Sequence, residues 1–381
     1  MAATVLGLMG TDLILPAIPT LPEAIGGDAA TAQLVLAAYV AGASIGLLAY
    51  GALGDRVATH TLLVCSLFLT GITSLACGFA PSVEMLITLR ALQGAAASGA
   101  AVLAPAIIRA LFEERAAIHA IGALGSIESL APALAPILGA WLLGVGSWRL
   151  SFDLIAAAAF ALAAIAAFLP LIPQASRRPR GSYRLLITDP VYLRYALSHA
   201  FVLGGLLVFV FGAPAVLVRV YGGSLADFIV MQVAGITIFI LAANAAGRLA
   251  LRFGAERMIS FGTMLALAGA AAMLAYALAG GSAPLLVTIL FIPINTGLGL
   301  RGPPGFYRAV VASHGDDARG SALVILAIMA ATAFGTAAVA PMIEYGLVPL
   351  AAACFLLELA AAACLLMLPP LSDSQSRPSS A

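Results

Sequence analysis

The sequence predicts an all-α integral membrane protein whose twelve transmembrane helices form two six-helix bundles. Of its 381 residues, 62% are hydrophobic and only 9% are charged, whereas an ordinary soluble domain has about 25% charged residues. A helix needs about 20 apolar residues to cross the hydrocarbon core, and the chain contains twelve such runs in series. This composition excludes a soluble enzyme, and the runs are too long for the alternating strands of a β-barrel.

Charged residues and Gly/Pro clusters set the ends of the predicted spans. The spans are residues 2–22, 31–53, 61–80, 83–109, 116–143, 150–172, 192–218, 226–251, 258–279, 284–310, 318–341 and 347–368. A polar, arginine-rich linker at residues 174–191 separates an N-terminal bundle, residues 1–173, from a C-terminal bundle, residues 192–370. Residues 371–381 have the composition of a disordered tail.

Arginines set the predicted orientation, because basic residues gather in cytoplasmic loops. All eighteen basic residues are arginine, and fourteen of them lie on the side of the membrane shared by both termini. Both termini are therefore expected in the cytoplasm. A net charge of +1 gives no reason to expect nucleic acid as a partner, and the four cysteines lack the spacing of a metal site.

Two short motifs recur about half a chain apart. The segment from Gly51 to Arg56 follows the second span, and a similar segment at residues 247–257 follows the eighth. A proline followed by Arg109 ends the fourth span, and a proline pair followed by Arg308 ends the tenth. Such echoes predict a duplicated six-span unit, as in many secondary transporters.

Five motifs in order along the chain resemble those of the major facilitator superfamily, and within it the twelve-span drug:proton antiporters of the bicyclomycin/chloramphenicol-resistance branch. They are Asp12-Leu-Ile-Leu-Pro16-Ala-Ile-Pro19, the loop residues Gly51, Leu53, Asp55 and Arg56, Leu89-Arg90-Ala-Leu-Gln93-Gly94, the antiporter motif with Pro132, Pro136 and Gly139, and Trp148-Arg149. The resemblance implies the major facilitator fold and a monomer in the bilayer of the bacterial inner membrane. It also implies transport of a small molecule, with the proton as coupling ion, no other cofactor and no enzymatic activity.

Three charged residues within the predicted spans are candidates for proton coupling. Asp12 lies about 15 Å below the outer end of the first span, near the middle of the hydrocarbon core. Glu128 lies at a similar depth in the fifth span, and Arg90 lies in the fourth. A carboxylate at this depth must be protonated, paired or facing water, and a guanidinium needs an acid or several carbonyls. We expect Arg90 to reach Asp12 or Glu128, directly or through water. A structural hydrogen bond of either acid is the alternative.

Five further side chains are candidates for the substrate cavity. They are Gln93, Tyr39, Asn295, Arg301 and Phe209. Arg301 is expected to bind an anionic group or to extend toward the inner interface. Glu358, in the middle of the last span, is expected to face a neighbouring helix.

The cytoplasmic loops contain the candidates for gating. By resemblance, Asp55 and Arg56 of the loop after the second span would brace the closed inner side with Arg109 and Asp317. The loop continues with Val57-Ala-Thr-His60, where the family pattern has glycine and basic residues. Gly42 and Gly46 form a GxxxG pattern, which we interpret as packing within the chain.

The predicted function is proton-coupled export of drugs or small organic molecules by alternating access. One alternative is a transporter of organic anions or metabolites on the same fold, with Arg90 and Arg301 as the substrate clamp. A membrane enzyme or a receptor is another, but the sequence offers neither an evident nucleophile–base pair nor a soluble effector domain.

Overall fold

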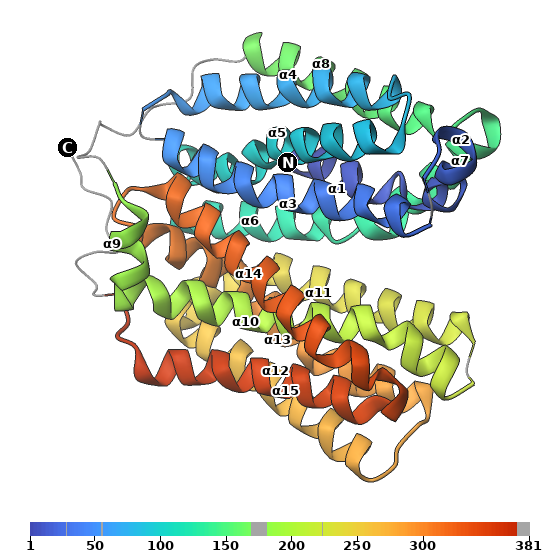
Figure 1. Cartoon of the computed structure of the whole chain (residues 1–381). Coiled ribbons are helices and arrows are strands. Elements are labelled where there is room, and N and C mark those ends of the chain that lie inside the picture. Colours follow the sequence, from blue (N-terminus) through green and yellow to red (C-terminus); the bar gives the residue numbers. More distant parts are fainter. Residues whose placement is uncertain (28, 55, 169–180, 223, 372–381) are drawn as a thin grey trace. The chain divides into compact units, whose positions relative to one another are not determined.

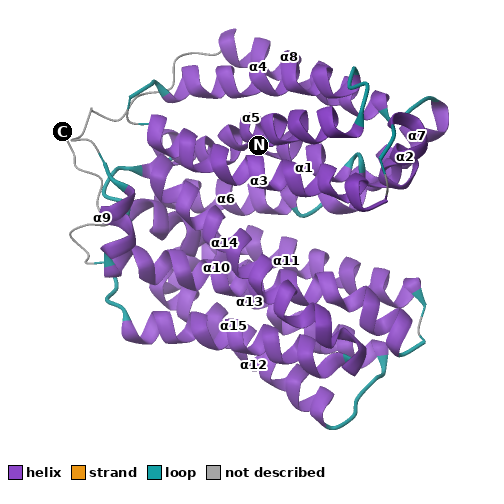
Figure 2. Ribbon diagram, in the orientation of Figure 1, coloured by secondary structure: helices purple, strands orange, loops and turns teal. Residues whose placement is uncertain are grey.

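Helices make up the regular structure of this chain. A computed structural model describes residues 1–27, 29–54, 56–168, 181–222 and 224–371 (Figure 1), and within these ranges it contains helices and loops but no strand (Figure 2). Ten of the described helices are long and apolar enough to cross a membrane, and two apolar stretches, Ala2–Ile18 and Leu134–Val145, are shorter. The predicted all-α membrane architecture is confirmed. Residues 174–180 of the predicted linker and residues 372–381 of the predicted tail lie outside the described residues.

The chain forms two compact units, neither of which is continuous in sequence. The first unit comprises Met1–Leu111, Ile127–Ser182 and Asp316–Ala322, and the second comprises Phe112–Ser126, Tyr183–Gly315 and Leu323–Ala381. A short segment of each sequence half thus packs with the other half. The domain boundaries predicted at residues 173 and 192 stay predictions.

The helices divide between the two units. Those of the first unit are α1 (Ala2–Asp12), the 3-10 helix η1 (Leu15–Thr20), α2 (Leu21–Ile25), α3 (Ala29–Leu53), α4 (Thr59–Gly78), α5 (Val83–Leu111), α7 (Ala131–Val145) and α8 (Arg149–Phe168). Those lying wholly or mainly in the second are α6 (Glu114–Glu128), α9 (Tyr183–Thr188), α10 (Pro190–Pro214), the π-helix η2 (Ala215–Val220), α11 (Leu225–Phe253), α12 (Ala255–Leu278), α13 (Pro284–Val311), α14 (Asp317–Val339), the 3-10 helix η3 (Ala340–Tyr345) and α15 (Leu347–Met367).

Several spans that the sequence predicts as continuous are interrupted beside a proline. The first span ends as α1 at Asp12 and continues as η1, which carries Pro16 in its first turn. The fifth span divides into α6, ending at Glu128, and α7, with Pro132 in its first turn. Proline lacks the N–H that would continue the helical hydrogen bonds, and its ring crowds the preceding turn. Both predicted proton-coupling acids therefore stand at the end of a helix.

Close packing of α3 on α5 positions the polar residues of the first unit. A Cβ atom at Gly42 would lie 1.8 Å from the carbonyl oxygen of Ala91, and one at Gly46 would lie 2.3 Å from that of Ala95. On the facing helix, a Cβ at Gly94 would lie 2.0 Å from the carbonyl oxygen of Tyr39. The GxxxG pattern thus serves packing within the chain, as the sequence indicated.

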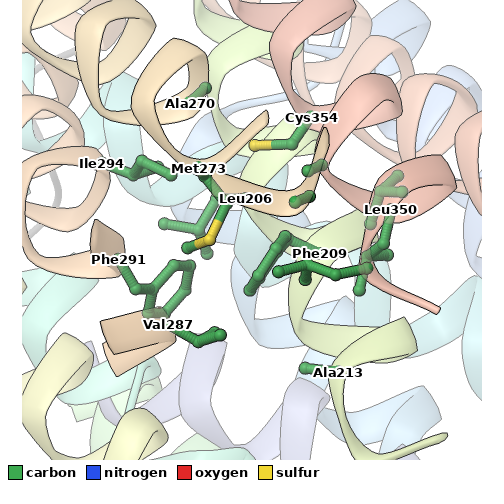
Figure 3. Packing of buried hydrophobic residues seen from close by; sticks show 14 of the residues in the cluster. Leu206, Phe209, Ala213, Ala270, Met273, Val287, Phe291, Ile294, Leu350 and Cys354 are labelled. Atoms are coloured by element: carbon green, nitrogen blue, oxygen red, sulfur yellow. The ribbon is translucent and has the colours of Figure 1, made fainter. Parts of the chain in front are cut away.

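Aromatic and aliphatic side chains fill the core of the second unit, where α10, α12, α13 and α15 meet (Figure 3). The rings of Phe209 and Phe291 stack with centroids 5.3 Å apart, and Met273 and Leu350 pack in the same cluster. Phe209 is fully buried there. Its place in a substrate cavity stays a prediction, because core packing alone accounts for its burial.

The α3–α5 contact supplies a test of stability. We expect Gly94→Ala to lower the free energy of unfolding by about 1–3 kcal/mol, because a methyl group there overlaps backbone atoms of α3. Gly144→Ala is the matched control, since no atom lies within 4 Å of the added carbon. The measurement is thermal unfolding of the two purified variants in detergent. Equal melting temperatures would contradict the packing described here.

Candidate proton and substrate site

Arg90 of α5 is completely buried, with 0% of its surface exposed. Its Nη1 donates hydrogen bonds to the carbonyl oxygen of Gly10 at 2.8 Å and to Oε1 of Gln93 at 2.6 Å, and its Nε donates to the carbonyl oxygen of Val35 at 3.3 Å. The guanidinium carbon also lies 4.2 Å from the centre of the Tyr39 ring. Oxygen dipoles and an aromatic face from α1, α3 and α5 thus stabilise this buried charge.

Among the described residues Arg90 makes no direct ion pair with Asp12 or Glu128, so the direct contact is wrong for this structure, and contact through water stays a prediction. All hydrogen bonds of Arg90 within the described residues go to uncharged oxygens. The physical reason lies in the break after Asp12, because the last carbonyls of a helix have no partner within it. Gly10 belongs to this last turn of α1, so its oxygen is free to accept from Arg90.

Gln93 and Tyr39, two of the predicted cavity residues, extend the Arg90 network to other helices. Gln93 Nε2 donates to the Ser74 hydroxyl of α4 at 2.7 Å, and that hydroxyl donates to the Thr70 carbonyl at 2.6 Å. The Tyr39 hydroxyl donates to the Gly7 carbonyl of α1 at 2.6 Å. These bonds tie α1, α3, α4 and α5 together around one positive charge. Ser74 could not be singled out from the sequence, because it is one of several hydroxyl residues in an apolar run and no pattern distinguishes it from Thr70 and Thr73.

Asp12 lies next to this network but remains outside it. It is the last residue of α1, it is partly exposed, and its carboxylate interacts electrostatically with Tyr39. Among the described residues its side chain has no ion pair. Because Arg90 is bonded elsewhere, no side-chain cation neutralises Asp12 in this conformation.

Glu128 meets α1 near the other end of that helix. It is the last residue of α6, it is partly exposed, and its side chain lies beside Thr4. Thr4 and Asp12 are eight residues apart, about 12 Å along a helix axis. The structure therefore places the two acids at different positions along α1 and does not join them in a pair.

The antiporter motif lies on α7, against the bend that follows Asp12. A Cβ at Gly139 would lie 2.1 Å from the carbonyl oxygen of Leu13, so the missing side chain permits this contact. Pro132 stands in the first turn of α7 and Pro136 inside it. The motif thus determines how closely a helix approaches the residue after Asp12.

The remaining cavity candidates lie in the second unit. Arg301 is 0% exposed, and it donates from Nη1 to the Ser198 carbonyl at 2.7 Å and from Nη2 to the Ser198 hydroxyl at 3.0 Å. The expectation that it extends to the membrane interface is wrong. Asn295 is buried as well, and its Nδ2 donates to the Phe291 carbonyl at 3.0 Å.

Ion pairs join the ends of span pairs that the internal repeat makes equivalent. Arg109, at the end of α5, pairs with Asp317, the first residue of α14. Arg308, its counterpart at the end of α13, pairs with Glu114, the first residue of α6, at 3.1 Å. From the sequence, Arg109 and Asp317 were each expected to contact Asp55 rather than each other. The pair of Arg308 with Glu114 was not expected, although the echo between Arg109 and Arg308 was the signal that could have found it.

The other gating candidates lie in the loop after α3. Arg56 is exposed, and Asp55 lies outside the described residues. Just before them, the Ala52 carbonyl accepts a hydrogen bond from Arg319 of α14 at 3.1 Å. The end of α3 and the start of α14 are therefore in contact within the first unit. The gating roles stay predictions.

A family model described as Major Facilitator Superfamily matches residues 1–340. The chain belongs to this superfamily. It is 30% identical over 288 residues to the chloramphenicol resistance protein of Pseudomonas aeruginosa, covering 71% of this chain and 67% of that protein. It is 29% identical over 303 residues to YdgK of Bacillus subtilis (strain 168), an uncharacterized MFS-type transporter. That match covers 77% of this chain and 75% of YdgK.

Solved structures of the superfamily share the fold. The outward conformation of the transporter FucP superposes with a TM-score of 0.72 at 15% identity, covering 95% of this chain and 97% of FucP. The predicted major facilitator fold is confirmed, as is the predicted resemblance, since relatives named for chloramphenicol and bicyclomycin resistance both match. The chain is thus a multi-pass membrane transporter of small molecules.

Charge reversal tests the pair at the ends of α5 and α14. Arg109→Asp and Asp317→Arg should each slow transport by about fivefold, because each places like charges together and a partly exposed pair contributes about 1 kcal/mol. The double variant should recover most of the rate. Initial rates in proteoliposomes are the measurement. A double variant as slow as the slower single variant would show that the two residues do not act as a pair.

Proposed function

We propose that this transporter exports drugs or other small organic molecules in exchange for protons. The observation that carries the proposal is the position of Asp12, a carboxylate at the broken end of α1 that has no ion pair with any described residue, although a buried arginine lies nearby. An uncompensated carboxylate within a membrane span is costly. A proton or a cationic group of the substrate would remove that cost, and the two would compete.

Competition at one carboxylate couples the two fluxes. When Asp12 binds a proton, the site is neutral and the substrate is released; when substrate binds, the proton leaves. Glu128, also at a helix end, is proposed as a second proton-binding group near Thr4. Alternating access of a central site would then convert a proton gradient into export.

The relative named for chloramphenicol resistance supports a drug-like substrate. The alternative, an organic anion bound by Arg90 and Arg301, has weaker support. Both guanidinium groups are fully buried and already donate to oxygens of the protein. An anion would have to enter a fully buried site and compete with those acceptors. Competition between cationic, neutral and anionic compounds for one transport signal would separate the two proposals.

The remaining features of the proposal follow from the family resemblance and from the arginine distribution. We propose a monomer in the bacterial cytoplasmic membrane with both termini inside, the proton as the only coupling ion or cofactor, and neither enzymatic activity nor nucleic-acid binding. The decisive experiment is flux in proteoliposomes driven by an imposed pH gradient, measured over a panel that includes chloramphenicol. If the flux of the panel compounds does not depend on the pH gradient, proton coupling is refuted.

Removal of the carboxylate at position 12 tests its role directly. Asp12→Asn should reduce gradient-driven flux to that of empty liposomes, because the amide cannot exchange a proton at transport pH. Folding should be retained, since the side chain is partly exposed and has no ion pair to lose. Asp153→Asn, at an exposed position of α8, is the matched control and should transport normally. Normal flux in Asp12→Asn would refute the proposed role.

Glu128→Gln should shift the pH optimum of transport while keeping the contact with Thr4. With one titrating group removed, the rate should depend less steeply on proton concentration. The measurement is initial rate against pH for the wild type and the variant. An unchanged profile would assign Glu128 to a structural hydrogen bond.

A further inference from the structure

A second group of buried charged and polar residues lies in the second unit, away from Asp12 and Glu128. Glu358 in the middle of α15 is 0% exposed, Arg301 of α13 is 0% exposed, and His199 of α10 is 6% exposed. Glu358 and Arg301 interact electrostatically, and so do Arg301 and His199. The proposed coupling at Asp12 uses none of these three groups.

Glu358 lacks the partners that a buried carboxyl group normally has. Neither of its oxygens accepts a hydrogen bond from any described residue, and Nδ1 of His199 and Nε of Arg301 are also unpartnered. Buried charges in proteins are paired almost without exception, because an isolated one loses its hydration without compensation. In the arrangement described, Glu358 is therefore stable only with its proton bound.

The guanidinium of Arg301 is held away from Glu358 by Ser198, which accepts from both Nη1 and Nη2. Glycines of α13 and α10 lie against the cluster. A Cβ at Gly305 would lie 3.0 Å from Nη2 of Arg301 and 3.7 Å from Nδ1 of His199, and one at Gly205 would lie 3.6 Å from Oε1 of Glu358. Movement of the arginine from Ser198 to Glu358 would pair the two charges.

We infer that Glu358 is a proton-binding site of the second unit, with Arg301 as the counter-charge that governs release. With Arg301 bonded to Ser198, Glu358 retains its proton. When Arg301 turns to Glu358, the O–H bond breaks, the proton passes to water, and an ion pair remains. The inference rests on the proposed proton coupling only for its consequence in transport.

The other ionisable groups around Glu358 do not replace it as the proton-binding acid of the cluster. On α15 itself Cys354 lies one turn before it and Cys364 nearly two turns after it. On α12, Glu256 also interacts electrostatically with Arg301, but it already pairs with Arg194 and Tyr195 of α10. Glu358 is thus the acid of this cluster that has no hydrogen-bonded partner within the described residues.

Infrared spectroscopy of the purified full chain during pH titration tests the inference without any transport measurement. The wild type should show a carboxylic-acid C=O band that disappears as pH rises, and Glu358→Gln should lack it. Asp12→Asn and Glu128→Gln should retain that band. Arg301→Gln should keep the band to more alkaline pH, because the counter-charge that favours release is gone. Labelling the protein with ¹³C-glutamate should shift the frequency of this band, and that shift would assign the band to a glutamate.

Ser198→Ala leaves the titrating groups unchanged, so it tests the inference even if Glu358→Gln does not fold. The variant removes one of the two acceptors that hold Arg301, so the band should disappear at lower pH. A band of full intensity in Glu358→Gln, or pH profiles unchanged in both Arg301→Gln and Ser198→Ala, would overturn the inference. A wild type that shows the band but no proton-driven flux would instead refute the proposed function.

Discussion

The burial of Arg90 is the constraint on which the first unit depends. A guanidinium stays charged at any physiological pH, so it must find acceptors wherever it is buried. Here the acceptors come from backbone, and one of them exists only because α1 ends where its Gly10 carbonyl is left free. The close α3–α5 packing supplies the Val35 carbonyl. The break in α1 and the small residues of α3 and α5 therefore serve the same purpose, which is to bring carbonyl acceptors to the buried Arg90.

The same solution recurs on the repeat-equivalent helix, where Arg301 of α13 bonds to Ser198 of α10. In both units the arginine donates its hydrogen bonds to uncharged oxygens, and within the part of the chain that the structure describes an acid in the vicinity has no ion pair. An arginine paired to a carboxylate would hold that carboxylate ionised. Arginines bound to neutral oxygens instead leave the acids free to exchange protons, which a proton-coupled transporter requires.

The sequence was sufficient for the spans, the superfamily and the place of the charged residues, because these depend on composition and on local motifs. It was insufficient wherever the backbone supplied the partner. The carbonyls that accept from Arg90 and the bends after Asp12 and Glu128 arise from how helices end, and a proline in a membrane span does not by itself say whether the helix bends or stops. The pair between Arg308 and Glu114 could have been predicted from the repeat, but only on the assumption that equivalent residues of the two halves make equivalent contacts.

Exposure separates the two kinds of acid in this chain and bears on how they could be used. Asp12 and Glu128 end broken helices and are partly exposed, so a proton or a substrate can reach them without a change in the core. Glu358 is enclosed in the middle of an unbroken helix, and its proton can leave only when its neighbours move. An acid of the first kind suits direct competition between proton and substrate, and one of the second kind suits a proton that is exchanged only when the protein changes conformation.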